Sequence, residues 1–172
     1  KNGKRFIRYL SCIAIGVPIW YMIGILVTFS PEFAKELHIE NVQAGSSVMY
    51  FYLGTSFGDF MSGYLSQIFK TRKKILLLYL IITVFMVPVY LFTANISSTM
   101  FYFICAMLGI AAGYWAVCVT IASEQFGTNL RSTVTTTVPN FVRGSLVLLT
   151  LLLNLFRNNF LFSLVHSALF VG

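Results

Sequence analysis

The chain has 172 residues, of which 58% are hydrophobic and only 10% are charged, and its mean hydropathy is +0.82. A soluble domain of this length does not carry so apolar a composition, so the sequence predicts an integral membrane protein. Twelve Lys and Arg against five Asp and Glu give a net charge of +7. The basic residues lie in short segments between apolar runs, which indicates membrane orientation rather than nucleic-acid binding.

Apolar runs of membrane-crossing length predict five complete helices and a truncated sixth. Helices are expected because the runs lack the alternation of a membrane barrel. The predicted fold is therefore an all-α membrane protein in which residues 1–172 form one bundle. The chain begins with Lys1 and ends inside an apolar run too short to span a bilayer, so we expect a fragment of a longer protein. The predicted helices are Arg8–Ser30, Gly45–Phe69, Ile75–Thr93, Thr99–Gln125, Thr133–Phe156 and the truncated run 160–172.

The distribution of basic residues predicts which ends of the helices face the cytoplasm. The positive-inside rule places the N-terminus, the loop after the second helix and the loop after the fourth in the cytoplasm of a multi-pass protein in an inner or plasma membrane. The segment 31–44 would then lie outside, and it is compatible with a short helix along the membrane surface. The basic residues concerned are Lys1, Lys4, Arg5, Arg8, Lys70, Arg72, Lys73, Lys74 and Arg131.

The sequence contains no pattern of residues that indicates catalysis or metal binding. Cys12, Cys105 and Cys118 all fall inside apolar segments and lack the spacing of a metal or redox site, so we expect them to be packing residues. There is no nucleophile–base pair, HExxH motif or phosphate loop. The expected protein is not an enzyme and has no cofactor and no metal.

An acid and a base interrupt two of the predicted helices. Asp59 lies on a stripe of small polar residues along the second helix, and Arg143 lies with Asn140 on a similar stripe along the fifth. A charge at the membrane centre costs about 2.5–3.5 kcal/mol on insertion scales, so such residues usually face a hydrated path. The stripes favour a polar pathway across the membrane. A buried ion pair that ties the two helices together remains the alternative.

Aromatic and small residues mark further positions inside the spans. Trp20–Tyr21 and Tyr114–Trp115 lie near the middle of their helices, whereas aromatic belts lie at membrane interfaces. They suit either the wall of a solute cavity or plain core packing. Glycines spaced by four on the second helix (Gly54, Gly58) and on the fourth (Gly109, Gly113) predict close helix packing and say little about a substrate.

Two loop motifs resemble those of the major facilitator superfamily. The first is GYLSQIFKTRKK, Gly63–Lys74, with Gln67 where the family motif has an acid and Lys70 where it has a glycine. The second is EQFGTNLR, Glu124–Arg131, which looks like the family's acid–Phe/Pro–Thr–x–x–Arg element. The resemblance implies a gating role for the inner residues Gly63, Arg72, Lys73, Glu124 and Arg131. Anchoring of Arg131 to lipid headgroups is the alternative.

The resemblance implies a fold of two six-helix bundles with a solute site between them and alternating access. This chain would be the C-terminal half, with the lipid bilayer, a small solute and a missing N-terminal six-helix half as partners. The expected function is secondary active transport of a small polar or anionic solute, with proton coupling as a further expectation. Asp59 would carry the proton, because removal from water favours a neutral carboxyl group, and Arg143 would bind a carboxylate or phosphate. A non-transporting receptor or scaffold with the same fold is the alternative.

Overall fold

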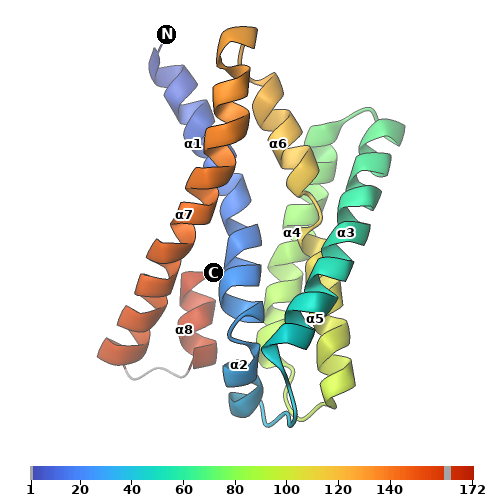
Figure 1. The fold of residues 1–172 in the computed structure, drawn as a ribbon, viewed down its shortest axis with the longest axis vertical. Coiled ribbons are helices and arrows are strands. Elements are labelled where there is room, and N and C mark those ends of the chain that lie inside the picture. The colour runs from blue at the N-terminus through green and yellow to red at the C-terminus, as the bar shows by residue number, and fades with distance from the viewer. Residues whose placement is uncertain (1, 161–163) are drawn as a thin grey trace.

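The structure, a computed structural model, describes residues 2–160 and 164–172, which form helices and their connections with no strand among them (Figure 1). All-α architecture is thus confirmed. The chain order is α1 (Asn2–Tyr21), the π-helix η1 (Met22–Val27), α2 (Ser30–Glu36), α3 (Ala44–Ile68), α4 (Arg72–Phe92), α5 (Ser98–Ala112), α6 (Trp115–Glu124), α7 (Thr128–Phe160) and α8 (Leu164–Val171).

The long helices run side by side, and their connections gather at two ends of the bundle. The N-terminus, the α3–α4 turn and the α6–α7 turn lie at the end drawn uppermost in Figure 1. Helix α2 and the α4–α5 connection lie at the opposite end. Helix α1 packs along α7, α3 packs along α5, and α6 contacts both groups. The segments predicted to be basic and inner therefore share one end of the molecule.

The prediction of five complete spans and a truncated sixth requires correction. Four helical stretches of the described residues are long and apolar enough to cross a membrane: Arg5–Val27, Arg72–Phe92, Ser98–Glu124 and Thr128–Phe156. Helix α3 has 25 residues, but its glycine, hydroxyl and acidic residues lower its hydropathy below that of these four. The predicted run 160–172 includes residues 161–163, which lie outside the described residues, and the helix that follows is only Leu164–Val171.

The boundaries of the first and fifth predicted helices also differ from the structure. Helix α1 begins at Asn2 rather than Arg8, and after Pro18 it continues into the π-helix η1 instead of remaining α-helical to Ser30. A proline removes a backbone donor and crowds the preceding turn, so helix geometry often changes near one. Helix α7 begins at Thr128, because the polar residues before Thr133 extend the helix beyond its apolar part.

The short helix expected in the segment 31–44 is present as α2, Ser30–Glu36, but it does not lie free on a surface. Phe33 is fully buried and packs edge-on against Tyr90 at 5.9 Å between ring centroids. The Glu36 carboxylate accepts hydrogen bonds from the backbone N–H groups of Leu164 and Val165 at 2.8 and 3.1 Å. An acid at the start of α8 satisfies its free donors, so α2 helps to hold α8 in place.

Glycines allow α3 and α5 to touch backbone to backbone. A Cβ atom built on Gly54 would lie 2.0 Å from the Ala106 carbonyl oxygen, and one on Gly109 would lie 2.1 Å from the Phe51 carbonyl oxygen. One on Gly113 would lie 2.3 Å from the carbonyl carbon of Gly58. The predicted close packing is confirmed, and we call this contact the glycine seam, formed by Gly54, Gly58, Gly109 and Gly113.

Candidate functional site

The predicted fourth helix is broken beside the glycine seam, and Asp59 lies at the break. Helix α5 ends at Ala112 and α6 begins at Trp115, so the first N–H groups of α6 lack partners within a continuous helix. Tyr114 stands at the N-cap position, but its side chain makes no capping hydrogen bond. The Asp59 carboxylate on α3 instead accepts the Ala116 N–H at 3.3 Å. An acid near a helix N-terminus is electrostatically favourable, so Asp59 caps α6 from another helix.

Arg143 on α7 has an aromatic partner rather than an acidic one. Its guanidinium carbon lies 5.3 Å from the centre of the Trp20 ring on α1, within the range of a cation–π interaction. The Arg143 side chain is exposed. The Trp20 indole N–H is buried and has no hydrogen-bond partner among the described residues. A buried donor without an acceptor costs about 1–3 kcal/mol, so Trp20 is held here at some cost to stability.

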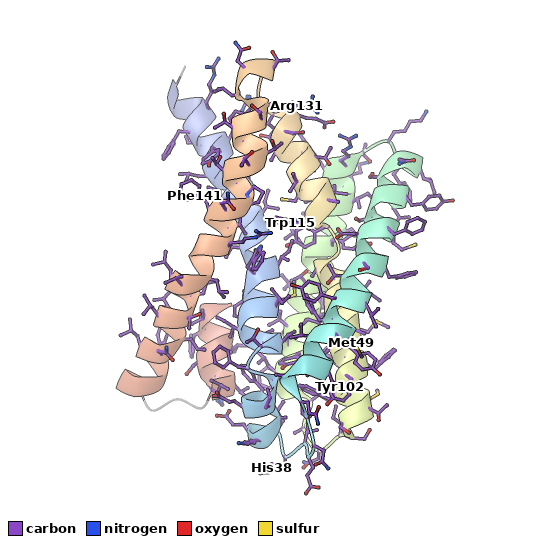
Figure 2. All side chains as sticks on the ribbon, viewed as in Figure 1. His38, Met49, Tyr102, Trp115, Arg131 and Phe141 are labelled. Atoms are coloured by element: carbon purple, nitrogen blue, oxygen red, sulfur yellow. The ribbon has the colours of Figure 1, made fainter. Side chains whose placement is uncertain are left out.

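Trp115 connects the two charged positions. Both tryptophans pack against a small cluster that includes Val138 and Val142, the residue before Arg143. A Cβ atom on Gly16 would lie 2.9 Å from a Val142 methyl group and 3.3 Å from the Trp115 ring. Helices α1, α6 and α7 therefore meet closely here, and Figure 2 shows Trp115 near the middle of the long axis. Trp115 also precedes Ala116, which Asp59 contacts.

Asp59 and Arg143 do not form an ion pair in this structure. The ion pair found among the described residues joins Arg72 to Glu124. The predicted neighbour of Arg143, Asn140, is exposed on α7 and makes no side-chain hydrogen bond with the described residues. Each central charge is thus held by its own partner, the start of α6 for the acid and an indole ring for the base.

The two predicted tyrosines lie in the core of the bundle. Tyr21 is 3% exposed and donates its hydroxyl hydrogen bond to the Ala168 carbonyl at 2.7 Å. Tyr114 is fully buried and donates to the Ile15 carbonyl at 3.2 Å. Both tyrosine hydroxyl groups are therefore engaged in hydrogen bonds within the core. In each aromatic pair it is the tryptophan that lies near a charged residue.

The two loop motifs meet at the end of the bundle that carries the basic turn. Arg72 at the start of α4 and Glu124 at the end of α6 form an ion pair, and their side chains are 43% and 51% exposed. Lys73 is exposed beside them, and Gly63 has open space where a side chain would be. Arg131 is exposed near the same end, as Figure 2 shows, and makes no ion pair or side-chain hydrogen bond with the described residues.

The strength of the Arg72–Glu124 pair can be measured by a double-mutant cycle. Because both side chains are about half exposed, we expect Arg72→Gln and Glu124→Gln to show a coupling energy of about 0.2–1 kcal/mol in thermal unfolding, decreasing as salt is added. Lys73→Gln combined with Glu124→Gln is the matched control and should be additive. Equal coupling in both cycles would mean that the arginine has no specific partner.

A groove of about 1020 Å³ lies against this ion pair. Its walls are the last turns of α3, the α3–α4 turn, the first turn of α4 and one face of α6, including Ala116. The groove therefore extends from the basic end of the bundle to the backbone that Asp59 contacts.

The comparisons with known proteins agree with this architecture. The family model of the Major Facilitator Superfamily matches residues 4–170. The chain belongs to the Major Facilitator Superfamily. It is therefore a multi-pass integral membrane protein of a transporter family, and the resemblance stated on the loop motifs is confirmed. No curated protein and no solved structure matched the chain.

Two features of this superfamily member were not predicted from its sequence. The break between α5 and α6 places the N–H of Ala116 against Asp59; the sequence signal near it is Gly113, an isolated glycine that weakens a helical pattern without requiring a break. Tyr79 on α4 donates a hydrogen bond to the Gly58 carbonyl at 3.1 Å, immediately before Asp59. No periodic pattern distinguishes Tyr79 from the other aromatic residues of its helix.

Proposed function

We propose that the chain is the C-terminal half of a secondary active transporter that moves a small polar or anionic solute by alternating access against an N-terminal six-helix bundle. The observation that carries the proposal is that Asp59 on α3 and Arg143 on α7 have different partners, the first turn of α6 for Asp59 and Trp20 of α1 for Arg143. A permanent ion pair would neutralise both charges. Two charges with different partners leave a base that can bind an anion and an acid that can exchange a proton.

Arg143 and Trp20 are the proposed solute contacts. The guanidinium group offers a planar fork of donors that fits a carboxylate or a phosphate. The Trp20 indole ring beside it offers an apolar surface for the rest of the solute. We therefore favour a small organic anion over a neutral sugar.

The proposed orientation places the chain's N-terminus in the cytoplasm. It is supported by the position of the basic α3–α4 turn, the N-terminus and the α6–α7 turn at one end of the bundle, in keeping with the positive-inside rule. Helix α3 has a lower hydropathy than the four long spans. In this proposal it crosses the membrane together with them, because it packs along α5. The arrangement also makes Arg72–Glu124 an inner ion pair that rearranges as the bundles rock.

The proposal is tested by anion binding and uptake with Arg143 variants. We expect at least one of acetate, succinate, glutamate, inorganic phosphate and glucose 6-phosphate to raise the Tm of the purified protein. Arg143→Gln should weaken that binding by about 10- to 100-fold, since a charge-assisted hydrogen bond contributes about 1.5–3 kcal/mol. Arg143→Lys should retain part of the affinity because the charge remains without the fork.

Arg8→Gln is the matched control, because it removes an exposed arginine of α1 about three turns from Trp20, and it should leave anion binding unchanged. Unaltered binding in Arg143→Gln would overturn the site. Binding by the wild type without uptake of the same labelled anion into proteoliposomes would overturn transport and indicate the receptor alternative.

A further inference from the structure

We propose that the groove between the α3–α4 turn and α6 binds a phosphate-bearing anion, with the headgroup of an anionic phospholipid as its source in the membrane. This site is separate from the solute contacts at Arg143 and Trp20. Four basic residues line the groove within five consecutive positions, Lys70 and Arg72–Lys74. One acid, Glu124, is among the lining residues, and it is engaged by Arg72.

The charge balance of the groove favours an anion. With Arg72 paired to Glu124, the ammonium groups of Lys70, Lys73 and Lys74 have no acidic partner among the described residues. Three like charges on one short turn repel each other, and a phosphate group relieves this repulsion. The hydroxyl side chain of Thr71 and the amide of Gln67 add polar partners in the same lining.

The walls and surroundings of the groove favour a lipid. Its α6 side presents apolar residues, Val117 and Ile121, below the charged rim. The adjacent end of α3 exposes large side chains, with Tyr64 and Ile68 each 54% exposed and Phe69 60% exposed. A cytoplasmic basic pocket bordered by exposed apolar side chains suits a molecule with an anionic head and an apolar body.

Lys70 has an unfavourable backbone conformation. Its φ is 50°, in the left-handed region that strains a residue with a Cβ atom and that glycine adopts readily. A lysine here is worse for the fold than a glycine, yet it contributes one of the groove's charges. Lys70→Gly therefore separates charge from folding, because it should keep or improve stability while removing one cation.

The experiment measures thermal stabilisation and lipid affinity in detergent with three probes: phosphatidylglycerol, phosphatidylcholine and inorganic phosphate. We expect phosphatidylglycerol to raise the Tm more than phosphatidylcholine, with an affinity that falls as salt is added. Lys70→Gly should weaken phosphatidylglycerol binding about fivefold, as a basic residue at a membrane surface contributes about 1 kcal/mol. Adding Lys73→Gln should weaken it further.

Lys35→Gln is the matched control, because Lys35 is an exposed lysine on α2 at the opposite end of the bundle. The proposal would be overturned if Lys35→Gln and Lys70→Gly had equal effects on phosphatidylglycerol binding. It would also be overturned if the protein did not prefer phosphatidylglycerol over phosphatidylcholine and did not bind inorganic phosphate. Competition between inorganic phosphate and phosphatidylglycerol would confirm one shared site. Binding of inorganic phosphate that Lys70→Gly weakens and Arg143→Gln leaves unchanged, without a lipid preference, would identify a soluble phosphate as the source. Lys74→Gln, at an exposed helix position, repeats the test should Lys70→Gly fold poorly.

Discussion

Gly109→Ala should lower the free energy of unfolding by about 2–4 kcal/mol, because its methyl group would overlap the backbone of α3. The added carbon would lie 2.1 Å from the carbonyl oxygen of Phe51 and 2.9 Å from its carbonyl carbon. Both atoms belong to the backbone of α3, so no side-chain rotation relieves the overlap. The helices must move apart along the seam, which loses the contacts on both sides of Gly109.

Gly63→Ala is the matched control for this prediction. Gly63 is on α3 as well, but a Cβ atom there has nothing within 4 Å. Alanine in that position should stabilise the helix by about 0.5–1 kcal/mol. Thermal unfolding of both variants in the same detergent gives the comparison. If Gly109→Ala is as stable as Gly63→Ala, then α3 and α5 are not in backbone contact.

Asp59→Asn should reduce proton movement coupled to anion uptake by about tenfold or more, because a positioned acid contributes about 10²–10⁴ to a proton transfer. Asparagine keeps an oxygen that can accept the Ala116 N–H, but it cannot take up a proton. The start of α6 should therefore stay capped, and the Tm should change little. The proton flux is measured as acidification of the proteoliposome interior, read with a pH-sensitive dye. The anion added is the one that stabilises the protein most.

Asp59→Ala separates the capping role from the proton role. It removes both the charge and the acceptor, so its free energy of unfolding should fall by about 1 kcal/mol relative to Asp59→Asn. Proton flux should be lost in both variants. Unchanged flux in Asp59→Asn together with a loss of stability in Asp59→Ala would show that the residue only caps α6.

Much of the fold follows from simple sequence rules, since apolar length and the absence of alternation predicted helices near their observed positions. The glycine spacing predicted close helix packing, and the structure shows it between α3 and α5, because only glycine allows backbones so close. Hydropathy was less informative for α3, where the same polar stripe that suggests function makes the helix less apolar. The end of the α-helical part of the first span depends on local backbone geometry after Pro18, which periodicity does not encode.

The candidate site was predictable as a set of residues but not as a set of contacts. Asp59 and Arg143 stand out because a charged side chain in an apolar helix is costly to insert into a membrane. The sequence pattern was also compatible with an ion pair between them. Their actual partners, a backbone N–H and an indole ring, depend on the break after Ala112 and on the close approach of α1 to α7. Similarly, the sequence does not show which of Trp20 and Tyr21 faces the core. Only the structure shows that the Tyr21 hydroxyl group donates a hydrogen bond there.

The break between α5 and α6 also has a mechanical consequence. The glycine seam packs α3 and α5 backbone to backbone, so we expect them to move together. Helix α6 follows after two residues of chain, with the Asp59–Ala116 hydrogen bond at its first turn and packing against α3. Helix α6 has 10 residues, which is a lever arm of about 15 Å. Rotating it by about 10° at the break displaces its far end by roughly 2.6 Å over that length. Glu124 is at that far end, so a rotation of α6 at the break would move Glu124 relative to Arg72 on α4.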